Sequence, residues 1–139
     1  MGEMPQTRCR ISNLHAKTLR QSHMRFDTSY SRGLFAEFLA RVYLRLHGYR
    51  ILRNRYITGR HTNRAEIDII AKRGGTLLFV EVKQRKTIDC AWNAITRQQI
   101  ARLRRAAETY ISQTRWNGNA RFDVIIVCGW RIRHIKNAI

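Results

Sequence analysis

Residues 65–83 read AEIDIIAKRGGTLLFVEVK, two apolar runs that meet at Gly74-Gly75. A glycine pair between two such runs is a strong signal for a β-hairpin with a two-residue turn. The register that this turn fixes places Asp68 directly opposite Glu81. Cross-strand partners hold their Cβ atoms roughly 4.5–5.5 Å apart on one face of the sheet. Two carboxylates at that distance repel each other unless a positive charge lies between them, so the hairpin predicts a site for a cation.

A lysine belongs to the same pattern. Side chains alternate along a strand, so Lys83 shares a face with Glu81 while Val80 and Val82 point the other way. The alternative is purely structural: the same register places Lys83 opposite Glu66, and a salt bridge there would leave the two acids to the solvent. The surrounding residues are apolar on both faces, which favours a buried strand pair. Buried neighbouring carboxylates need a partner, so we favour a hard cation with an ammonium group beside it.

Positive charge dominates the rest of the chain. Its 139 residues include 27 lysines and arginines but 9 acids, a formal charge of +18. Lysine and arginine side chains that neutralise phosphates release counterions, which gives affinity for nucleic acid of any sequence. An anionic membrane surface or a ribosomal partner would also suit the charge, but we favour nucleic acid. We expect the contacts to come from Arg53, Asn54, Arg55, Arg64, Arg97, Gln99 and Arg104.

The length predicts one domain, over residues 30–139, preceded by a flexible basic extension over residues 1–29. The extension lacks the apolar core of a secretory signal, and a start at Met24 is an alternative reading of the chain. No run is long and apolar enough to cross a membrane. The cysteines are few and widely spaced, which favours reduced thiols and a cytoplasmic location.

The predicted elements follow the order α-β-β-β-α-β, with one further short strand at the end. A helix over residues 34–47 has Ser29 or Ser31 as its cap and Gly48 as its stop. The later elements are strands over 49–56, the hairpin, a helical region over 91–112 in which Thr96 and Gln99 form a capping box, a strand over 122–127 and an edge strand over 130–135. This order predicts an α/β or α+β fold with a mixed central sheet flanked by helices.

The first helix has one unusual acid. Its main apolar stripe is Phe35, Phe38, Leu39, Val42 and Leu46. Glu37 lies away from that stripe among small and apolar residues, so we expect it to face other parts of the protein. An ion pair with Arg41, one helical turn later, is the alternative.

These residues together resemble a known group of nucleases. A helix with a glutamate, a strand ending in Asp68, a hairpin and Glu81-Val-Lys83 are similar to the PD-(D/E)xK nucleases, which include restriction endonucleases and archaeal Holliday-junction resolvases. Ala65-Glu-Ile-Asp-Ile-Ile-Ala71, Phe79-Val-Glu-Val-Lys83, Arg121-Phe-Asp-Val124 and Arg133-His-Ile135 resemble the YraN-like family of small bacterial proteins expected to be endonucleases. Two positions depart from that family, Ala65 in place of a glycine and Arg97 in place of a proline.

The resemblance implies a restriction-endonuclease-like core and a role for each residue of the site. Asp68 and Glu81 would hold Mg²⁺, or Mn²⁺ in its place, with Glu37 and the Val82 carbonyl completing the set. Lys83 would position or deprotonate the attacking water. Oxygen donors of this kind are those that Mg²⁺ prefers.

The expected function is therefore metal-dependent cleavage of DNA, with branched or junction DNA as the substrate by analogy. A homodimer would suit such substrates. Two alternatives stay open: a non-catalytic nucleic-acid-binding protein, and a nuclease-fold subunit that acts only with a DNA-processing partner.

Overall fold

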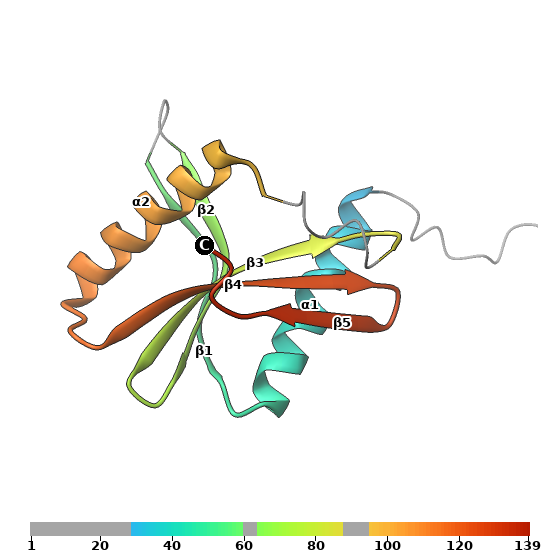
Figure 1. Ribbon diagram of the computed structural model, residues 1–139, viewed down its shortest axis with the longest axis horizontal. Helices are drawn as coiled ribbons and strands as arrows, with labels where there is room; N and C mark the ends of the chain where they lie inside the picture. Colours follow the sequence, from blue (N-terminus) through green and yellow to red (C-terminus); the bar gives the residue numbers. More distant parts are fainter. Residues whose placement is uncertain (1–28, 60–63, 88–94) are drawn as a thin grey trace, which may run out of the picture.

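The computed structural model describes residues 29–59, 64–87 and 95–139, so the predicted extension over residues 1–29 lies almost wholly outside the described residues (Figure 1). The elements are α1 (Ser29–Leu46), β1 (Arg50–Thr58), β2 (Ala65–Arg73), β3 (Thr76–Gln84), α2 (Arg97–Thr114), β4 (Asn119–Cys128) and β5 (Arg131–Ile135). This order confirms the predicted α+β fold with a mixed sheet, β5 included.

The five strands form one sheet in the order β1-β2-β3-β4-β5. Only the β3–β4 pair is parallel; the other three neighbouring pairs are antiparallel. The chain passes from β3 to β4 through α2, as a parallel connection requires. The interior position of β2 and β3 confirms that this strand pair is buried.

The sheet forks between its second and third strands. The β2–β3 ladder runs from Arg73↔Thr76 to Ile69↔Val80 and includes no later pair. Beyond it β2 stays paired with β1 as far as Thr58↔Ala65, and β3 stays paired with β4 as far as Gln84↔Val127. In Figure 1 the β1–β2 arm rises toward α2 while the β3–β4 arm runs to the right.

Glycines set the turns that the sequence predicted. Gly74 has a φ of 55° at the hairpin turn, and Gly48 has a φ of 79° after the last turn of α1. Both values lie in the left-handed region, which glycine adopts without a steric penalty. The hairpin register predicted from Gly74-Gly75 is confirmed over the five pairs from Ile69↔Val80 to Arg73↔Thr76.

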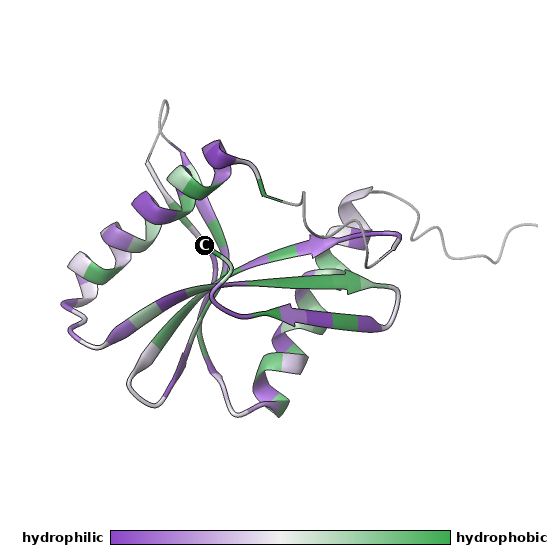
Figure 2. Cartoon of the chain, in the orientation of Figure 1, coloured by the Kyte–Doolittle hydropathy of each residue, from purple (hydrophilic) through white to green (hydrophobic). Residues whose placement is uncertain are grey.

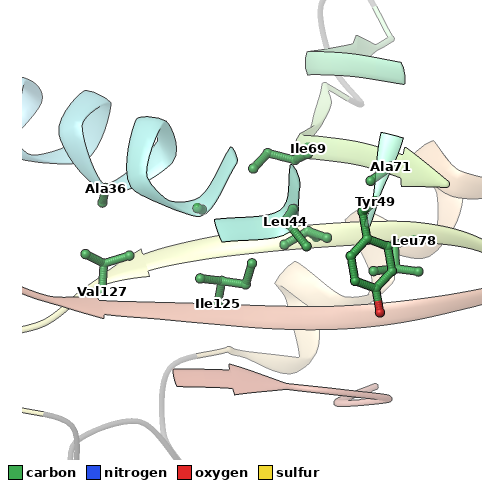
Figure 3. Packing of buried hydrophobic residues seen from close by; sticks show 10 residues of the cluster. Ala36, Leu44, Tyr49, Ile69, Ala71, Leu78, Ile125 and Val127 are labelled. Atoms are coloured by element: carbon green, nitrogen blue, oxygen red, sulfur yellow. The ribbon is translucent and has the colours of Figure 1, made fainter. Parts of the chain in front are cut away.

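Helix α1 packs on one face of the sheet through two alanines and one leucine. Ala36, Ala40 and Leu44 contact a buried cluster that includes Ile69 and Ile125, and Figure 3 shows side chains of α1 and of the strands meeting there. The larger apolar stripe predicted for this helix points mainly outward: the exposed fractions are 42% for Phe35, 51% for Phe38 and 81% for Leu46. Small residues allow the helix to approach the sheet closely, so side-chain size rather than hydrophobicity selects the buried face. Glu37 lies on that buried face, as predicted.

Helix α2 covers the other face. Its buried residues are Leu103, Ala106, Ala107 and Tyr110. The helix is banded purple and green in Figure 2, as expected when one side is polar and the other apolar. The capping box of Thr96 and Gln99 is confirmed, with both reciprocal hydrogen bonds present. Residues 91–94 of the predicted helical region lie outside the described residues. Neither described helix has the long apolar stretch needed to cross a bilayer.

Candidate functional site

The sheet is interrupted at Asp68. On the β1 side the pairs pass from Asn54↔Ile69 to Tyr56↔Ile67, and on the β3 side they stop at Ile69↔Val80, so neither ladder includes Asp68. The side chains of β2 on either side of Asp68 also point to opposite faces of the sheet. Ile67 packs against α2 and Ile69 against α1, although residues two apart on a regular strand share a face. Asp68 therefore lies where the fork begins, between the two helix layers.

The Asp68 carboxylate lies in a poorly solvated and negatively charged place. Burial, the charge of Glu81 and, more weakly, the charge of Glu37 together raise its pKa from 3.8 to about 7. A hydrogen bond from the backbone N–H of Val82 to Oδ2, at 2.7 Å, and the charge of Lys83 oppose this rise. The pKa of Asp68 is thus shifted by the charges of Glu81, Glu37 and Lys83, the other three predicted catalytic residues. Asp68 and Glu81 nevertheless lie just beyond the last pair of the ladder, so their predicted direct pairing is replaced by this looser juxtaposition.

Glu81 and Lys83 face the α2 side of the β3 arm, because Val80 and Val82 pack on the α1 side as predicted. The Lys83 ammonium donates to Glu81 Oε1 at 2.6 Å, and both side chains are largely buried. The alternative bridge from Lys83 to Glu66 does not form. The fork separates those two residues, and the partner of Glu66 is Arg64, at 3.8 Å.

Glu37 reaches the same region from α1, but its partner is Arg55 of β1. Nε of Arg55 donates to Oε2 at 3.0 Å and Nη2 donates to Oε1 at 2.8 Å, a bidentate arrangement. These hydrogen bonds and the charge of Glu37 raise the pKa of Arg55 above its ordinary value. The alternative pair of Glu37 with Arg41 is not the one that the structure shows.

The donor atoms available to a cation are limited. Within the described ranges, no group of three or more His, Cys, Asp or Glu side chains is arranged to share a metal ion. The N–H and C=O of one strand residue point to the same side of the strand. Because the Val82 N–H reaches Asp68 across the fork, the Val82 carbonyl also faces the fork. The set is thus two carboxylates, from Asp68 and Glu81, and one main-chain oxygen. It fits Mg²⁺, which keeps several waters and takes one or two carboxylates.

A polar cleft of about 320 Å³ adjoins this set. Its lining residues are Arg64, Glu66, Glu81, Gln99, Arg102 and Leu103. Arg64 and Gln99 were predicted to contact nucleic acid, whereas Arg102 was not among the predicted contacts. A second pocket, of about 620 Å³ at the start of α1, is larger but apolar, and no acid is among its described lining residues. The predicted site residue Glu81 therefore lines the smaller cleft and not the larger pocket.

The other predicted nucleic-acid contacts lie outside the cleft. Arg53 and Asn54 are exposed on β1, and Arg53 donates to the carbonyl of its neighbour Leu52 at 3.1 Å. Arg97 and Arg104 are exposed on α2. None of these four residues lines the cleft, and the three arginines add exposed positive charge outside it.

Sequence reasoning missed one buried polar cluster. Asp123 is 1% exposed on β4 and accepts hydrogen bonds from Arg121, from Nε2 of His134 at 2.7 Å and from the backbone N–H of Asn137. Burial alone would raise the pKa of Asp123, but the bonds from His134 and Arg121 hold it below its ordinary value. Arg121 also donates to the Tyr49 hydroxyl. A single acid in the apolar run after Arg121 was the available signal. The cluster joins β4 to β5 and to Tyr49, the residue before β1.

Comparison with known proteins gives one consistent group. The family model described as uncharacterised protein family UPF0102 matches residues 36–127, a range that contains Glu37, Asp68, Glu81 and Lys83. The protein amb4503 of Paramagnetospirillum magneticum is 41% identical over 110 residues, which cover 77% of this chain and 85% of the relative. The protein mlr4633 of Mesorhizobium japonicum is 40% identical over 113 residues, 79% of this chain and 87% of the relative. A relative from Methylorubrum extorquens is 41% identical over 113 residues, 79% of this chain and 85% of the relative. All three carry the same family name, and the chain belongs to the uncharacterised protein family UPF0102.

Proposed function

We propose that this protein is a metal-dependent endonuclease of the PD-(D/E)xK type that hydrolyses phosphodiester bonds of DNA. The observation that carries the proposal is the fork, where Asp68, Glu81 and Lys83 come together beside the polar cleft. Asp68 supports it most directly, because burial and the charge of Glu81 raise the pKa of this carboxyl to about 7. Strongly shifted carboxyls in a cleft are characteristic of functional sites.

In this proposal Asp68, Glu81 and the Val82 carbonyl hold Mg²⁺, with Mn²⁺ as a substitute. The bound ion would stabilise negative charge on the phosphate and lower the pKa of a coordinated water. Lys83 contributes a compact ammonium group beside Glu81, where it can orient the attacking water and take part in its deprotonation. The N–H of Val82 holds the Asp68 carboxylate in place through its 2.7 Å bond.

The surrounding charge supports nucleic acid as the substrate. The chain carries a formal charge of +18, and Arg64 and Arg102 line the cleft beside Glu81. Phosphates entering the cleft therefore approach the acids through a positive field, which raises the local concentration of an anionic substrate.

The test is a cleavage panel of single-stranded, duplex, flap and four-way DNA with Mg²⁺ or Mn²⁺. The wild type should cut at least one substrate, and preferential cutting of flap or four-way DNA would establish structure selectivity. Asp68→Asn and Lys83→Ala should remove cutting while DNA binding in EDTA persists. Arg131→Ala, which removes an exposed charge on β5, is the matched control and should cut normally. Equal cutting by wild type and the Asp68→Asn, Lys83→Ala double variant would refute the assignment.

Two close ion pairs favour a second candidate, a non-catalytic nucleic-acid-binding protein. Lys83 and Arg55 already neutralise Glu81 and Glu37, as a structural role would require. This candidate predicts salt-sensitive DNA binding without any Mg²⁺ binding that depends on Asp68. Isothermal titration calorimetry of wild type and Asp68→Asn with Mg²⁺ separates the two. Metal binding without cleavage would indicate a subunit that needs a partner.

A further inference from the structure

The guanidinium of Arg55 binds Glu37 on one side and has unused N–H donors on the other. Its guanidinium has five N–H donors in a rigid plane, and two of them bind Glu37. No described residue accepts a hydrogen bond from Nη1. The Arg55 side chain is 42% exposed while that of Glu37 is 12% exposed. The pair is therefore anchored in the protein and presents unused donors to the surface.

The backbone of Arg55 is also unusual. Its φ is 51°, in the left-handed region, which costs a residue with a side chain roughly 1–2 kcal/mol. In the β1–β2 register Arg55 is the residue opposite Asp68, at the position that the ladder skips. Costly backbone conformations persist where the surroundings enforce them, and they cluster at functional sites. The strand therefore turns out of its regular path beside the proposed metal ligand.

We infer that Arg55 is a substrate-binding residue, oriented by Glu37 so that its outer N–H groups bind a phosphate of the nucleic-acid strand lying in the fork. The inference rests on the proposed function and deepens it. A guanidinium matches the geometry of phosphate oxygens and can bind two of them at once. Glu37 then acts through Arg55, as a positioning residue, and the metal ion is left to Asp68, Glu81 and Val82.

The first test measures DNA affinity against salt concentration in EDTA, by fluorescence anisotropy. Losing one phosphate contact lowers the slope of log affinity against log salt by about 0.9, and this is the change expected for Arg55→Ala. Because Arg55→Ala leaves Glu37 buried without a partner, the Glu37→Gln, Arg55→Ala double variant is measured beside it, with thermal melts to establish folding. Arg50→Ala is the matched control. It removes an exposed arginine from the closed end of the same strand, about 16 Å away at 3.3 Å per residue, and should leave the slope unchanged. An unchanged slope in both Arg55 variants, or an equal fall with Arg50→Ala, would overturn the inference.

The second test separates positioning from metal binding. Glu37→Gln should leave the Mg²⁺ affinity measured by calorimetry within about twofold of wild type, whereas a fall of tenfold or more would make Glu37 a metal ligand and refute its role here. Arg55→Lys keeps the charge but loses the bidentate geometry, so it should keep the salt slope and lower kcat at least tenfold. A kcat equal to that of wild type would contradict oriented binding. If the wild type cuts no DNA, the proposed function fails, and the salt slopes alone decide whether Arg55 binds phosphate.

Discussion

Replacing Asp68 with asparagine should stabilise the protein at alkaline pH while removing its activity. Asparagine keeps an oxygen that can accept the hydrogen bond from the Val82 N–H but has no charge to bury. In the folded state the pKa of Asp68 rises from 3.8 to about 7. Because one pKa unit corresponds to about 1.4 kcal/mol, this shift destabilises the folded state by at most about 4 kcal/mol once the carboxyl is ionised. The free energy of unfolding of Asp68→Asn should exceed that of wild type by up to this amount at pH 8.

The stability difference between Asp68→Asn and wild type should depend on pH in one direction. The folded state binds the Asp68 proton more tightly than the unfolded state does, because the folded pKa is the higher one. Below about pH 4 both states carry the proton, and Asp68 destabilises nothing. As the pH rises to about 7 the unfolded state ionises first, so the free energy of unfolding of the wild type falls. The difference between variant and wild type should therefore be near zero at pH 4 and grow up to about pH 8.

The assay is urea unfolding followed by far-UV circular dichroism in metal-free buffer, at several pH values from 2 to 8. Asp123→Asn is the internal contrast, because the pKa of Asp123 is lowered in the folded protein. Its stabilising effect is present above the unfolded pKa and is lost as the pH falls through the folded one. Asp123→Asn should therefore destabilise the protein at pH 7 and do so less at low pH. An Asp68→Asn variant no more stable than wild type at pH 8, or a difference that does not change with pH, would refute the burial argument.

Three further predictions concern the metal ion, the second helix and the first turn. Mg²⁺ at 100 times its dissociation constant should stabilise the wild type by about 2.7 kcal/mol, and thermal melts should show no such gain for Asp68→Asn. Thr96→Ala removes the capping box of α2 and should lower the free energy of unfolding by about 1 kcal/mol in urea titrations. Thr109→Ala, which removes a half-buried hydroxyl that donates to the Arg105 carbonyl within the helix, should have a smaller effect. Gly48→Ala forces a side chain into a φ of 79° and should cost about 1 kcal/mol in the same assay; no measurable loss would mean that the turn relaxes.

The hairpin could be predicted because its determinants are local. Gly74 and Gly75 set the turn, and the alternation of the flanking residues sets the register as far as Ile69↔Val80. Its far end could not be predicted in the same way. There β2 stays paired with β1, the preceding strand, and β3 stays paired with β4, which α2 separates from it in the sequence. The separation of Lys83 from Glu66 is therefore a tertiary effect that the turn geometry does not contain.

The apolar periodicity of α1 predicted the wrong buried face for a different reason. Phe35, Phe38 and Leu46 form the more hydrophobic stripe, yet the sheet receives Ala36 and Ala40. A periodicity argument weighs hydrophobicity and not side-chain volume, whereas a helix lying close on a sheet is limited by volume. Glu37 was placed correctly because its neighbours are small. Its partner Arg55 was not foreseen, because that bond joins residues 18 positions apart.

The charges at the fork make a functional interpretation stronger than a structural one. Three acids and two cations meet there, and each cation is bound to one acid: Arg55 to Glu37 and Lys83 to Glu81. Asp68 has no such pair within the described part of the chain, and it is the carboxyl whose pKa burial raises. In a chain with 27 basic residues, a cationic neighbour for Asp68 would be easy to supply, and a neutral residue would remove the cost altogether. Sites that bind or react with a ligand commonly sacrifice stability in this way. The penalty expected from the Asp68→Asn comparison is thus what a cation-binding carboxylate should show, whereas a purely structural role gives no reason for a destabilising charge at this position.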